Sequence, residues 1–349
     1  MEVQKLGESG LSISRVIVGC MTFGKKSYTD WFIEDKDRVF SILKKCYDSG
    51  LRTFDTADVY SNGESEILLG KFIKKYKIPR NKVVILSKCY FPTEHENPHF
   101  NSKSVAKAPA YEYANNQGSS RKHIFDAIQG SVERLGTYVD VLQIHRLDKS
   151  TPKREIMKAL NDVVEQGLAR YIGASAMKAI EFAQLQFIAD KNGWFKFISM
   201  QNYYNLTYRE EENEMIPFCN DSEFGKVGII PYSPLAKGIL TRPLGQKSQN
   251  NRTSDTDALQ KYYGLSELID SDKEIVNRVE ELAKKYKVNM ASVATAWLLI
   301  KGACPIVGIT SEERVDDYVE ACKLKLTKED TKFLEEPYVT KPAHLFFVL

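Results

Sequence analysis

The stretch VGCMTFGKK, from Val18 to Lys26, follows the first β-branched run of the chain and decides between two α/β folds. In an open, doubly wound sheet that binds a dinucleotide, the turn after the first strand carries the glycine pattern GxGxxG, because the backbone must approach a pyrophosphate closely. This stretch lacks that pattern. Its absence favours a closed (β/α)8 barrel, and the doubly wound sheet remains the rival interpretation at this point.

Along the whole chain, short apolar runs alternate with segments of helical periodicity, which is typical of βαβ units and a parallel sheet. We expect eight strands, at residues 16–20, 51–55, 83–88, 139–145, 171–175, 197–201, 227–232 and 304–308. We expect eight helices, at residues 36–49, 64–76, 121–135, 153–166, 179–192, 209–220, 272–301 and 311–321. Ser120 is the expected N-cap of the third helix. Eight strands and eight helices predict an α/β protein of the (β/α)8 TIM-barrel class.

Composition and charge narrow the range of partners. The 349 residues include 49 Lys plus Arg and 46 Asp plus Glu, with a formal net charge of +3. The two signs are interleaved, which argues against nucleic acid and against an anionic membrane surface. The opening MEVQKLGESG is polar, and no apolar run approaches the roughly 18 residues of a membrane span. We expect a cytoplasmic protein with a neutral or small anionic partner and no obligate protein partner.

The cysteines and histidines predict neither disulfides nor a metal site. The cysteines have no CxxC spacing, which indicates buried thiols in a reducing compartment. His95 and His99 share the stretch HENPH, and on a helix this spacing could present both rings to a metal ion, but Pro98 argues against a helix there. The six cysteines are Cys20, Cys46, Cys89, Cys219, Cys304 and Cys322.

Some stretches do not fit the repeat of strands and helices. Residues 90–119 predict an inserted loop, residues 335–349 predict a C-terminal tail with an apolar end, HLFFVL, and residues 240–268 form a third irregular segment. No linker composition marks a second domain, so we expect one domain over residues 1–349. In a barrel, the long loops after strands three and seven border the C-terminal mouth, where active sites form.

Polar residues end six of the predicted strands, and closing the barrel would bring them to one rim. A lysine beside a carboxylate favours a nearby phenolate, so we expect Lys88 to lower the pKa of Tyr60 from about 10 and to make it a general acid near neutral pH. Each of these residues alone could be an ordinary cap or part of a surface ion pair. Asp, Lys and His at three successive strand ends together favour an active site instead. The strand-end residues are Asp55, Lys88, His145, Ser175, Gln201 and Tyr232.

Several ordered motifs resemble the aldo-keto reductase superfamily. They are FDTADVY at 54–60, continuing to Gly63 and Glu66, then SKCY at 87–90 and QIHR at 143–146. GLARYIGASAM at 167–177, QNYYN at 201–205, YSPLAKGIL at 232–240 and LEEPYV at 334–339 are similar to the fungal aryl-alcohol-dehydrogenase-like branch. The resemblance implies a TIM barrel whose bottom is closed by an N-terminal β-hairpin, here at residues 3–14. It also implies NADPH-dependent reduction of a carbonyl group without a metal ion.

The resemblance implies a catalytic role for four residues. Tyr60 matches the proton donor, and Lys88 and Asp55 match the pair that tunes it. His145 matches the residue that orients the carbonyl group. Hydride would pass from the nicotinamide to the carbonyl carbon while Tyr60 protonates the developing alkoxide, with no covalent intermediate.

Cofactor contacts are implied in the same way. Tyr232 matches the ring stacked on the nicotinamide, and Ser175 and Gln201 match groups that hold its carboxamide. The next position, usually Asn, is Ala176, so that contact is lost or is replaced by Asn202. Arg314 is the natural anchor for a 2′-phosphate, although a lysine common near Gly308 is missing. The remaining matches are Ser233, Leu235, Lys237 and Gly238 over the pyrophosphate, and Gly308, Ile309, Thr310 and Asp317 near the adenosine end.

Aromatic residues of two loops predict a pocket for an aryl or other apolar carbonyl compound, with ordinary loop packing as the alternative. Beyond Lys88 no basic cluster is evident at the mouth, so we do not predict a carboxylated or phosphorylated substrate. A second interpretation is a nicotinamide-nucleotide-binding redox sensor or regulatory protein with slow turnover. The intact catalytic quartet favours the enzyme, and no metal set or carboxylate pair supports a hydrolase or isomerase. The pocket residues are Phe23, Tyr28, Trp31, Tyr90 and Phe91.

Overall fold

An eight-stranded parallel sheet forms the centre of the molecule. The computed structural model describes residues 2–97, 100, 105, 107–109, 111–246, 263, 265 and 267–342. The sheet order is β10-β3-β4-β5-β6-β7-β8-β9. Each predicted strand is present: β3 (Ile17–Gly19), β4 (Thr53–Asp55), β5 (Val84–Cys89), β6 (Val139–Ile144), β7 (Ala169–Ser175), β8 (Phe197–Gln201), β9 (Gly228–Ile229) and β10 (Ile306–Gly308).

Backbone hydrogen bonds join the two ends of this strand order. The Cys304 N–H donates to the Ile229 carbonyl at 2.8 Å, and the Ile306 N–H donates to the Pro231 carbonyl at 3.0 Å. The sheet therefore curls until its edges meet, which removes the exposed edges that an open sheet would leave. The predicted barrel architecture is confirmed, and the doubly wound sheet is excluded.

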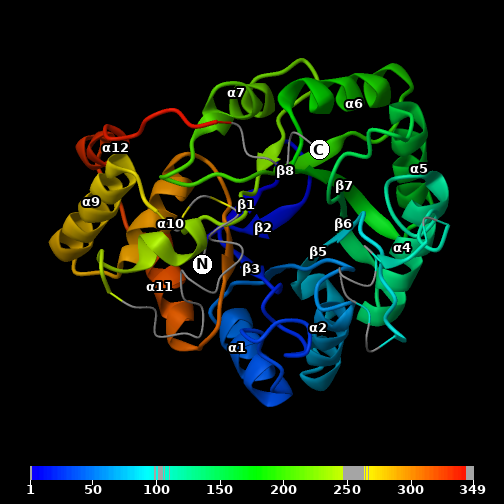
Figure 1. Cartoon of the computed structure of the whole chain (residues 1–349), viewed down its shortest axis with the longest axis horizontal. Coiled ribbons are helices and arrows are strands. Elements are labelled where there is room, and N and C mark those ends of the chain that lie inside the picture. Colours follow the sequence, from blue (N-terminus) through cyan, green and yellow to red (C-terminus); the bar gives the residue numbers. More distant parts are fainter. Residues whose placement is uncertain are drawn as a thin grey trace.

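Helices surround the strands (Figure 1). Their N-termini follow local rules: Ser120 accepts a hydrogen bond from the His123 N–H, as predicted, and Asp35 caps the first helix by accepting from the N–H groups of Asp37 and Arg38. The helices are α1 (Lys36–Asp48), α2 (Glu64–Lys75), α4 (Arg121–Leu135), α5 (Lys153–Glu165), α6 (Ala179–Lys191), α7 (Met215–Asn220), α9 (Asp270–Tyr286), α10 (Met290–Ile300), α11 (Glu313–Lys323) and α12 (Lys328–Glu335).

Three helical predictions need correction. The single helix predicted at 272–301 is two helices, because Lys287 adopts a left-handed conformation (φ 55°) that ends α9. The helix predicted at 209–220 is a 3-10 turn, η2 (Glu210–Glu212), followed by the short α7. Helix α12 was not predicted. A reciprocal pair of hydrogen bonds between Thr327 and Asp330 starts it.

The hydrophobic core has two parts. The larger part lies between the strands and the helices, and a smaller cluster includes early residues of the strands, such as Ile17 and Leu86. Leu6 and Ile13 of the antiparallel hairpin β1 (Val3–Lys5) and β2 (Ser12–Ser14) complete the smaller cluster. The predicted hairpin thus covers the end of the barrel where the strands begin, and the opposite end is left for a site.

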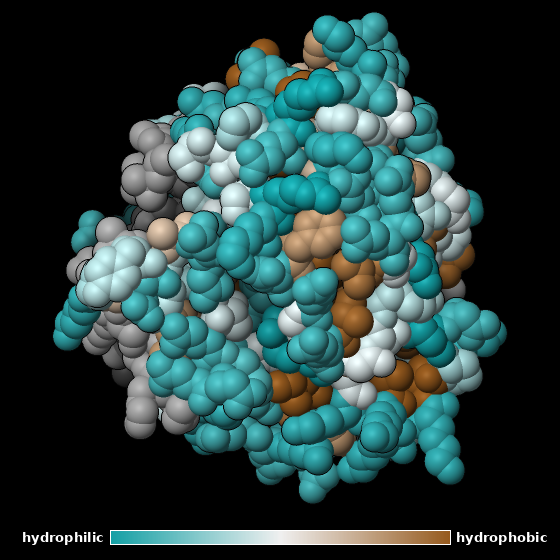
Figure 2. All heavy atoms as spheres, turned by 90° about the vertical axis from the view of Figure 1, so that its right-hand side faces the viewer, coloured by the Kyte–Doolittle hydropathy of each residue, from teal (hydrophilic) through white to brown (hydrophobic). Residues whose placement is uncertain are grey.

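The outer surface and the cysteines fit a globular protein. In Figure 2 hydrophilic side chains cover most of the face shown, with scattered apolar ones between them. Five of the six cysteines are buried, Cys322 is partly buried, and none forms a disulfide, as predicted. In the described ranges, no helix is long and apolar enough to cross a membrane, and no group of three or more His, Cys, Asp or Glu residues could hold a metal ion. His99, much of the 90–119 loop and residues 343–349 lie outside these ranges.

Candidate active site at the carboxyl ends of the strands

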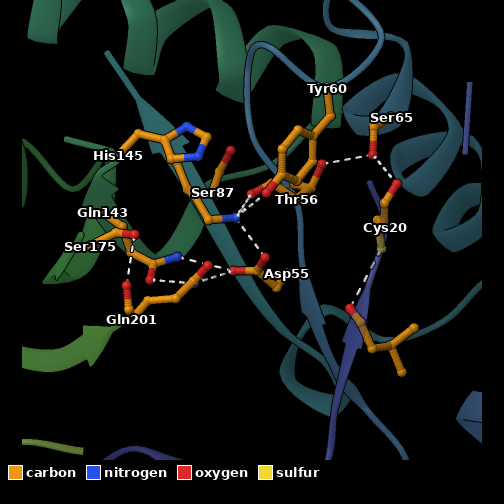
Figure 3. A network of polar contacts seen from close by, with 12 residues as sticks. Cys20, Asp55, Thr56, Tyr60, Ser65, Ser87, Gln143, His145, Ser175 and Gln201 are labelled. Carbon is orange, nitrogen blue, oxygen red and sulfur yellow. Dashed lines mark hydrogen bonds and ion pairs between the residues drawn. The ribbon is translucent and has the colours of Figure 1, made fainter. Parts of the chain in front are cut away.

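A buried lysine joins the first three polar groups of the site. Lys88, on β5, is fully buried, and its Nζ donates to Asp55 Oδ1 at 2.6 Å, to the Thr56 carbonyl at 2.8 Å and to the Tyr60 hydroxyl at 3.1 Å (Figure 3). Burial by itself lowers the pKa of Lys88, but the charge of Asp55 reverses this and leaves the pKa above its usual value. Lys88 is therefore a cation next to the Tyr60 phenol.

Two glutamines hold the second oxygen of Asp55. The Nε2 atoms of Gln143 and Gln201 donate to Asp55 Oδ2 at 3.1 and 3.0 Å, and Gln201 Nε2 also lies 2.9 Å from Gln143 Oε1. Ser175 Oγ donates to the Gln201 carbonyl at 2.8 Å (Figure 3). The predicted polar strand ends of β4, β5, β7 and β8 therefore meet in one network. A carboxylate with both oxygens bound keeps Lys88 in one orientation.

An unusual turn positions Tyr60. Ser61, Asn62 and Gly63 all adopt left-handed conformations, with φ of 50°, 54° and 87°. Neighbouring loops hold the turn: the Lys25 N–H donates to Ser61 Oγ at 2.8 Å, and the Asn62 side chain exchanges two hydrogen bonds with the backbone of Glu94, at 2.7 and 2.9 Å. Left-handed residues other than glycine cost energy and persist where tertiary contacts enforce them. The turn keeps the Tyr60 hydroxyl at Lys88.

The pKa of Tyr60 is raised, which corrects the expectation of a lowered value. Burial raises the pKa and outweighs the opposing charge of Lys88. The sequence could not weigh these two effects, because burial of the phenol depends on the closed barrel and its loops. The phenol therefore holds its proton across the neutral range, as a proton donor must.

His145 directly follows β6 and faces Tyr60. Its ring centroid lies 6.0 Å from that of Tyr60 and 5.2 Å from that of Phe91, edge-on in both cases. Burial lowers the pKa of His145 well below 6.5, and the charges of Arg146 and Lys88 lower it further. The imidazole is thus neutral at pH 7 and carries one N–H donor. Its buried Nδ1 has no hydrogen-bond partner among the residues with described positions.

The loop after β9 has a backbone suited to an anion. Ser233, Ala236, Lys237 and Gly238 have φ of 52°, 46°, 55° and 97°. Successive residues that include left-handed conformations turn their N–H groups into a concave nest, which binds anions. Asn205 Nδ2 supports the loop by donating to the Ser233 carbonyl at 3.1 Å. Leu235 lies in the same loop, half-buried, and Tyr232 before it packs on Tyr203 with ring centroids 5.6 Å apart.

The side chain of Asn202 is engaged inside the protein. Ala176 is left-handed (φ 48°), and its N–H donates to Asn202 Oδ1 at 2.9 Å. Asn202 Nδ2 donates to the buried carboxyl group of Glu211. The suggestion that Asn202 replaces the missing Asn at position 176 therefore loses support, because Asn202 holds the Ala176 backbone instead.

We expect Glu211→Gln to change the pH dependence of stability. Burial raises the pKa of Glu211 to about 7, so the folded protein binds a proton that the unfolded chain releases above its ordinary pKa of about 4.3. The free energy of unfolding of the wild type therefore falls between about pH 4.5 and pH 7, by on the order of 1 to 3 kcal/mol relative to Glu211→Gln. Urea unfolding at pH 5 and pH 8 measures this difference. The exposed Glu214→Gln is the control, and parallel pH curves for wild type and Glu211→Gln would contradict the prediction.

The predicted adenosine-end residues lie in and after β10. The Gly308 Cβ position has no atom within 4 Å, whereas Ile309 is fully buried. The Thr310 carbonyl accepts from Arg38 Nη2 at 3.0 Å, and the Asp317 carboxylate accepts from Asn289 Nδ2. Asp317 is therefore held by the protein itself, and Gly308 borders open space.

A second arginine, which the sequence analysis missed, joins Arg314. Arg242 Nη1 lies 3.6 Å from the position of a Gly238 Cβ. Burial lowers the pKa of Arg242, and the charge of Arg314 lowers it further. Neither has an ion pair within the described part of the chain. Arg242 lies in the irregular segment 240–268, where sequence periodicity offers no signal.

The predicted pocket residues form two pairs and one core residue. Tyr90 packs edge-on against Phe91 at 5.0 Å, and Phe91 reaches His145. Tyr28 and Trp31 pack on Phe32, with centroids 6.1 and 4.7 Å apart. Phe23 instead packs in the main core and is 1% exposed. Beside Phe91 lies Arg146, another residue that the sequence analysis missed, although it directly follows His145 in QIHR.

Comparisons with known proteins match nearly the whole chain. The Aldo/keto reductase family model matches residues 15–338. The Schizosaccharomyces pombe protein named "Putative aryl-alcohol dehydrogenase C977.14c" is 55% identical over 342 residues, covering 97% of this chain and 95% of its own. Versiconal hemiacetal acetate reductase of Aspergillus parasiticus is 50% identical over 350 residues, covering 99% of each chain. The aldo-keto reductase AMT2 of Alternaria alternata is 42% identical over 346 residues, 97% of this chain and 92% of its own.

Proposed function

Because the chain belongs to the aldo/keto reductase family, an oxidoreductase family that uses NAD(P)H, we propose that it reduces aryl or other apolar aldehydes and ketones to alcohols with NADPH. The observation that carries this proposal is the hydrogen bond from the buried Lys88 ammonium to the Tyr60 hydroxyl, with His145 beside it. Its partner is a small carbonyl compound. The free cysteines fit a reducing compartment, so we place the enzyme in the cytoplasm.

The residues present fit a nicotinamide dinucleotide. The left-handed loop 233–238 offers N–H groups for a pyrophosphate, and Arg242 and Arg314 offer two cations beside it. Ser175, Gln201 and the Tyr232 ring lie where the nicotinamide end would bind. Gln201 uses its Nε2 within the protein, which leaves Oε1 to accept from a carboxamide. When bound, the reduced nicotinamide supplies the hydride.

Residues of the chain itself supply the proton that the reduced carbonyl group needs. Tyr60 donates its hydroxyl proton to the carbonyl oxygen as negative charge develops there. The Lys88 ammonium stabilises the phenolate that remains, and Asp55 holds Lys88 in place. The neutral His145 donates a hydrogen bond to the same carbonyl oxygen. These donors are preorganised in a buried site, where they stabilise charge more strongly than they would in water.

Turnover itself is tested by the loss of NADPH absorbance with 4-nitrobenzaldehyde, an electron-poor aryl aldehyde. We expect NADPH-dependent formation of the alcohol. If the protein bound NADPH tightly and reduced no aldehyde or ketone, the proposal would fall and a nucleotide-binding redox sensor would replace it.

We expect Arg314→Gln and Arg242→Gln each to weaken NADPH binding by about 10- to 100-fold and to leave NADH binding within about twofold, because a charge-assisted contact to a phosphate contributes roughly 1.5 to 3 kcal/mol. Both cations would face the 2′-phosphate that NADH lacks, and together they would replace the lysine missing near Gly308. Titration of protein fluorescence with each nucleotide gives the Kd values.

The matched control is Arg170→Gln. Arg170 is an exposed arginine at the start of β7 and donates to the Gly167 carbonyl. Equal weakening of NADPH and NADH in the Arg314 and Arg242 variants would place these residues away from the 2′-phosphate.

A further inference from the structure

Arg146 directly follows His145 at the carboxyl end of β6. Its Nη1 donates to the His145 carbonyl at 2.5 Å, and its Cζ lies 6.0 Å from the centroid of the Phe91 ring. Phe91 contacts the His145 ring, which in turn contacts Tyr60. Two ring contacts therefore separate the guanidinium group from the phenol.

The charge of Arg146 acts on residues from several strand ends. It lowers the pKa of His145 more than Lys88 does, and it opposes the effect of burial at Tyr60, Tyr90 and Tyr232. These residues follow different strands, so the charge acts on the space that they share. The ring contacts agree with this, since Phe91 and His145 link the guanidinium group to Tyr60.

Two carboxylates, one at the end of β4 and one after β6, have partners of their own. Asp55 is paired with Lys88. Asp148 accepts from the Ser119 N–H and from the hydroxyl groups of Ser150 and Thr151. The charge of Lys88 is thus balanced inside the barrel, and Arg146 adds positive charge at the mouth.

An apolar wall accompanies this charge. Tyr90 and Phe91 pack edge-on and are both half-buried, and the Phe91 ring contacts the His145 ring. Arginine binds carboxylates through two parallel N–H···O bonds, and partial burial strengthens such contacts. An aromatic ring against Tyr90 and Phe91 would carry its own carboxylate toward Arg146 and its carbonyl group toward Tyr60 and His145.

We propose that Arg146 makes the enzyme prefer aryl aldehydes that carry a carboxylate on the ring. The inference rests on the proposed function and names the substrate class of that site. The sequence analysis did not predict a carboxylated substrate, because it found no basic cluster at the mouth beyond Lys88.

Two probes of nearly the same shape test the preference. 4-Formylbenzoate carries the carboxylate, and methyl 4-formylbenzoate has the same ring and aldehyde without the charge. Calorimetric Kd values are measured for both probes on protein saturated with NADP⁺, so the result does not depend on turnover. In Arg146→Gln we expect the acid-to-ester affinity ratio to fall about tenfold, in line with the loss of one charge-assisted contact.

Three further measurements sharpen the test. Arg146→Lys keeps the charge, so its ratio should stay within about threefold of wild type. Arg170→Gln is the matched control, since Arg170 also donates to a backbone carbonyl and stacks on an aromatic ring, Tyr138, at 3.9 Å. Its ratio should not change. In wild type the ratio should decrease between low and high salt, because salt screens a partly exposed ion pair.

The possible outcomes separate this inference from the proposed function. The inference is overturned if the acid-to-ester affinity ratio is unchanged in Arg146→Gln, or if that variant loses affinity for both probes equally. It is also overturned if 4-formylbenzoate does not bind to the wild type. In each of these cases turnover of 4-nitrobenzaldehyde continues. Failure of the proposed function would appear as absent NADPH oxidation with every aldehyde. If Arg146→Gln has a lowered Tm, the Arg146→Lys ratio and the salt dependence decide the matter.

Discussion

Tyr60→Phe should lower kcat for aldehyde reduction by about 10³-fold, within the range of roughly 10² to 10⁴ that general acid catalysis supplies. The substitution removes only the hydroxyl group that Lys88 contacts at 3.1 Å. Without it the developing alkoxide loses its proton donor and keeps only the hydrogen bond from His145. Stopped-flow measurement of NADPH consumption at saturating aldehyde gives kcat directly.

The Kd for NADPH and the Tm of Tyr60→Phe should match wild type, because the benzene ring and its contact with His145 remain. Tyr76→Phe, at the C-terminal end of α2, serves as the control for loss of a tyrosine hydroxyl far from the mouth. Retention of more than about a tenth of the wild-type kcat in Tyr60→Phe would assign the proton to another donor.

Lys88→Met should destabilise the fold by about 3 to 5 kcal/mol, because it leaves Asp55 as a buried charge without its cation. Lys88 and Asp55 are 0% and 2% exposed in their side chains, and their ion pair is 2.6 Å long. Activity should fall with stability, since the Tyr60 phenolate would lose its cation. Chemical denaturation gives the free energy of unfolding, and NADPH consumption gives the rate.

The double variant Asp55→Asn/Lys88→Met separates the two effects. It removes the uncompensated charge, so we expect recovery of more than half of the lost stability with no recovery of activity. Lys44→Met is the control, because Lys44 pairs with Asp48 on the surface of α1 and such pairs contribute about 0 to 1 kcal/mol. If Lys88→Met were as stable as Lys44→Met, the pair would not be the buried element that the structure shows.

These two predictions address different functions of one network. Tyr60 acts on the carbonyl oxygen, whereas Lys88 and Asp55 act through Tyr60 and through the fold. The glutamines that hold Asp55 come from β6 and β8. The same contacts therefore close the barrel interior and orient the proton donor, which explains why stability and catalysis are expected to change together at Lys88.

Local patterns in the chain are enough to predict the architecture. Short apolar runs mark buried strands, and helical periodicity marks the elements between them, so all eight strands fall where the sequence places them. In parallel strands that close a barrel, the carboxyl ends must share one rim. The meeting of Asp55 with Lys88, and of Ser175 with Gln201, follows from that topology and could be predicted.

Other features were not predicted. Lys287 adopts a left-handed conformation and divides a segment whose periodicity predicts one helix, and Thr327 and Asp330 form a local capping pair that starts a helix the sequence analysis did not expect. The elevated pKa of Tyr60 reflects burial by loops, which no local pattern measures. Of these features, only the pKa depends on packing between distant segments.

For residues in loops, the position of the side chain depends on the tertiary structure. Arg146 and Arg242 lie in loops, where no periodicity indicates the direction of a side chain. Only the folded chain brings Arg146 to Phe91 and Arg242 to Gly238 and Arg314. The strand order and the residues at the rim follow from short-range patterns, because each strand must bury its apolar side chains. The charges around the mouth depend on loop conformations, and many long-range contacts determine these together.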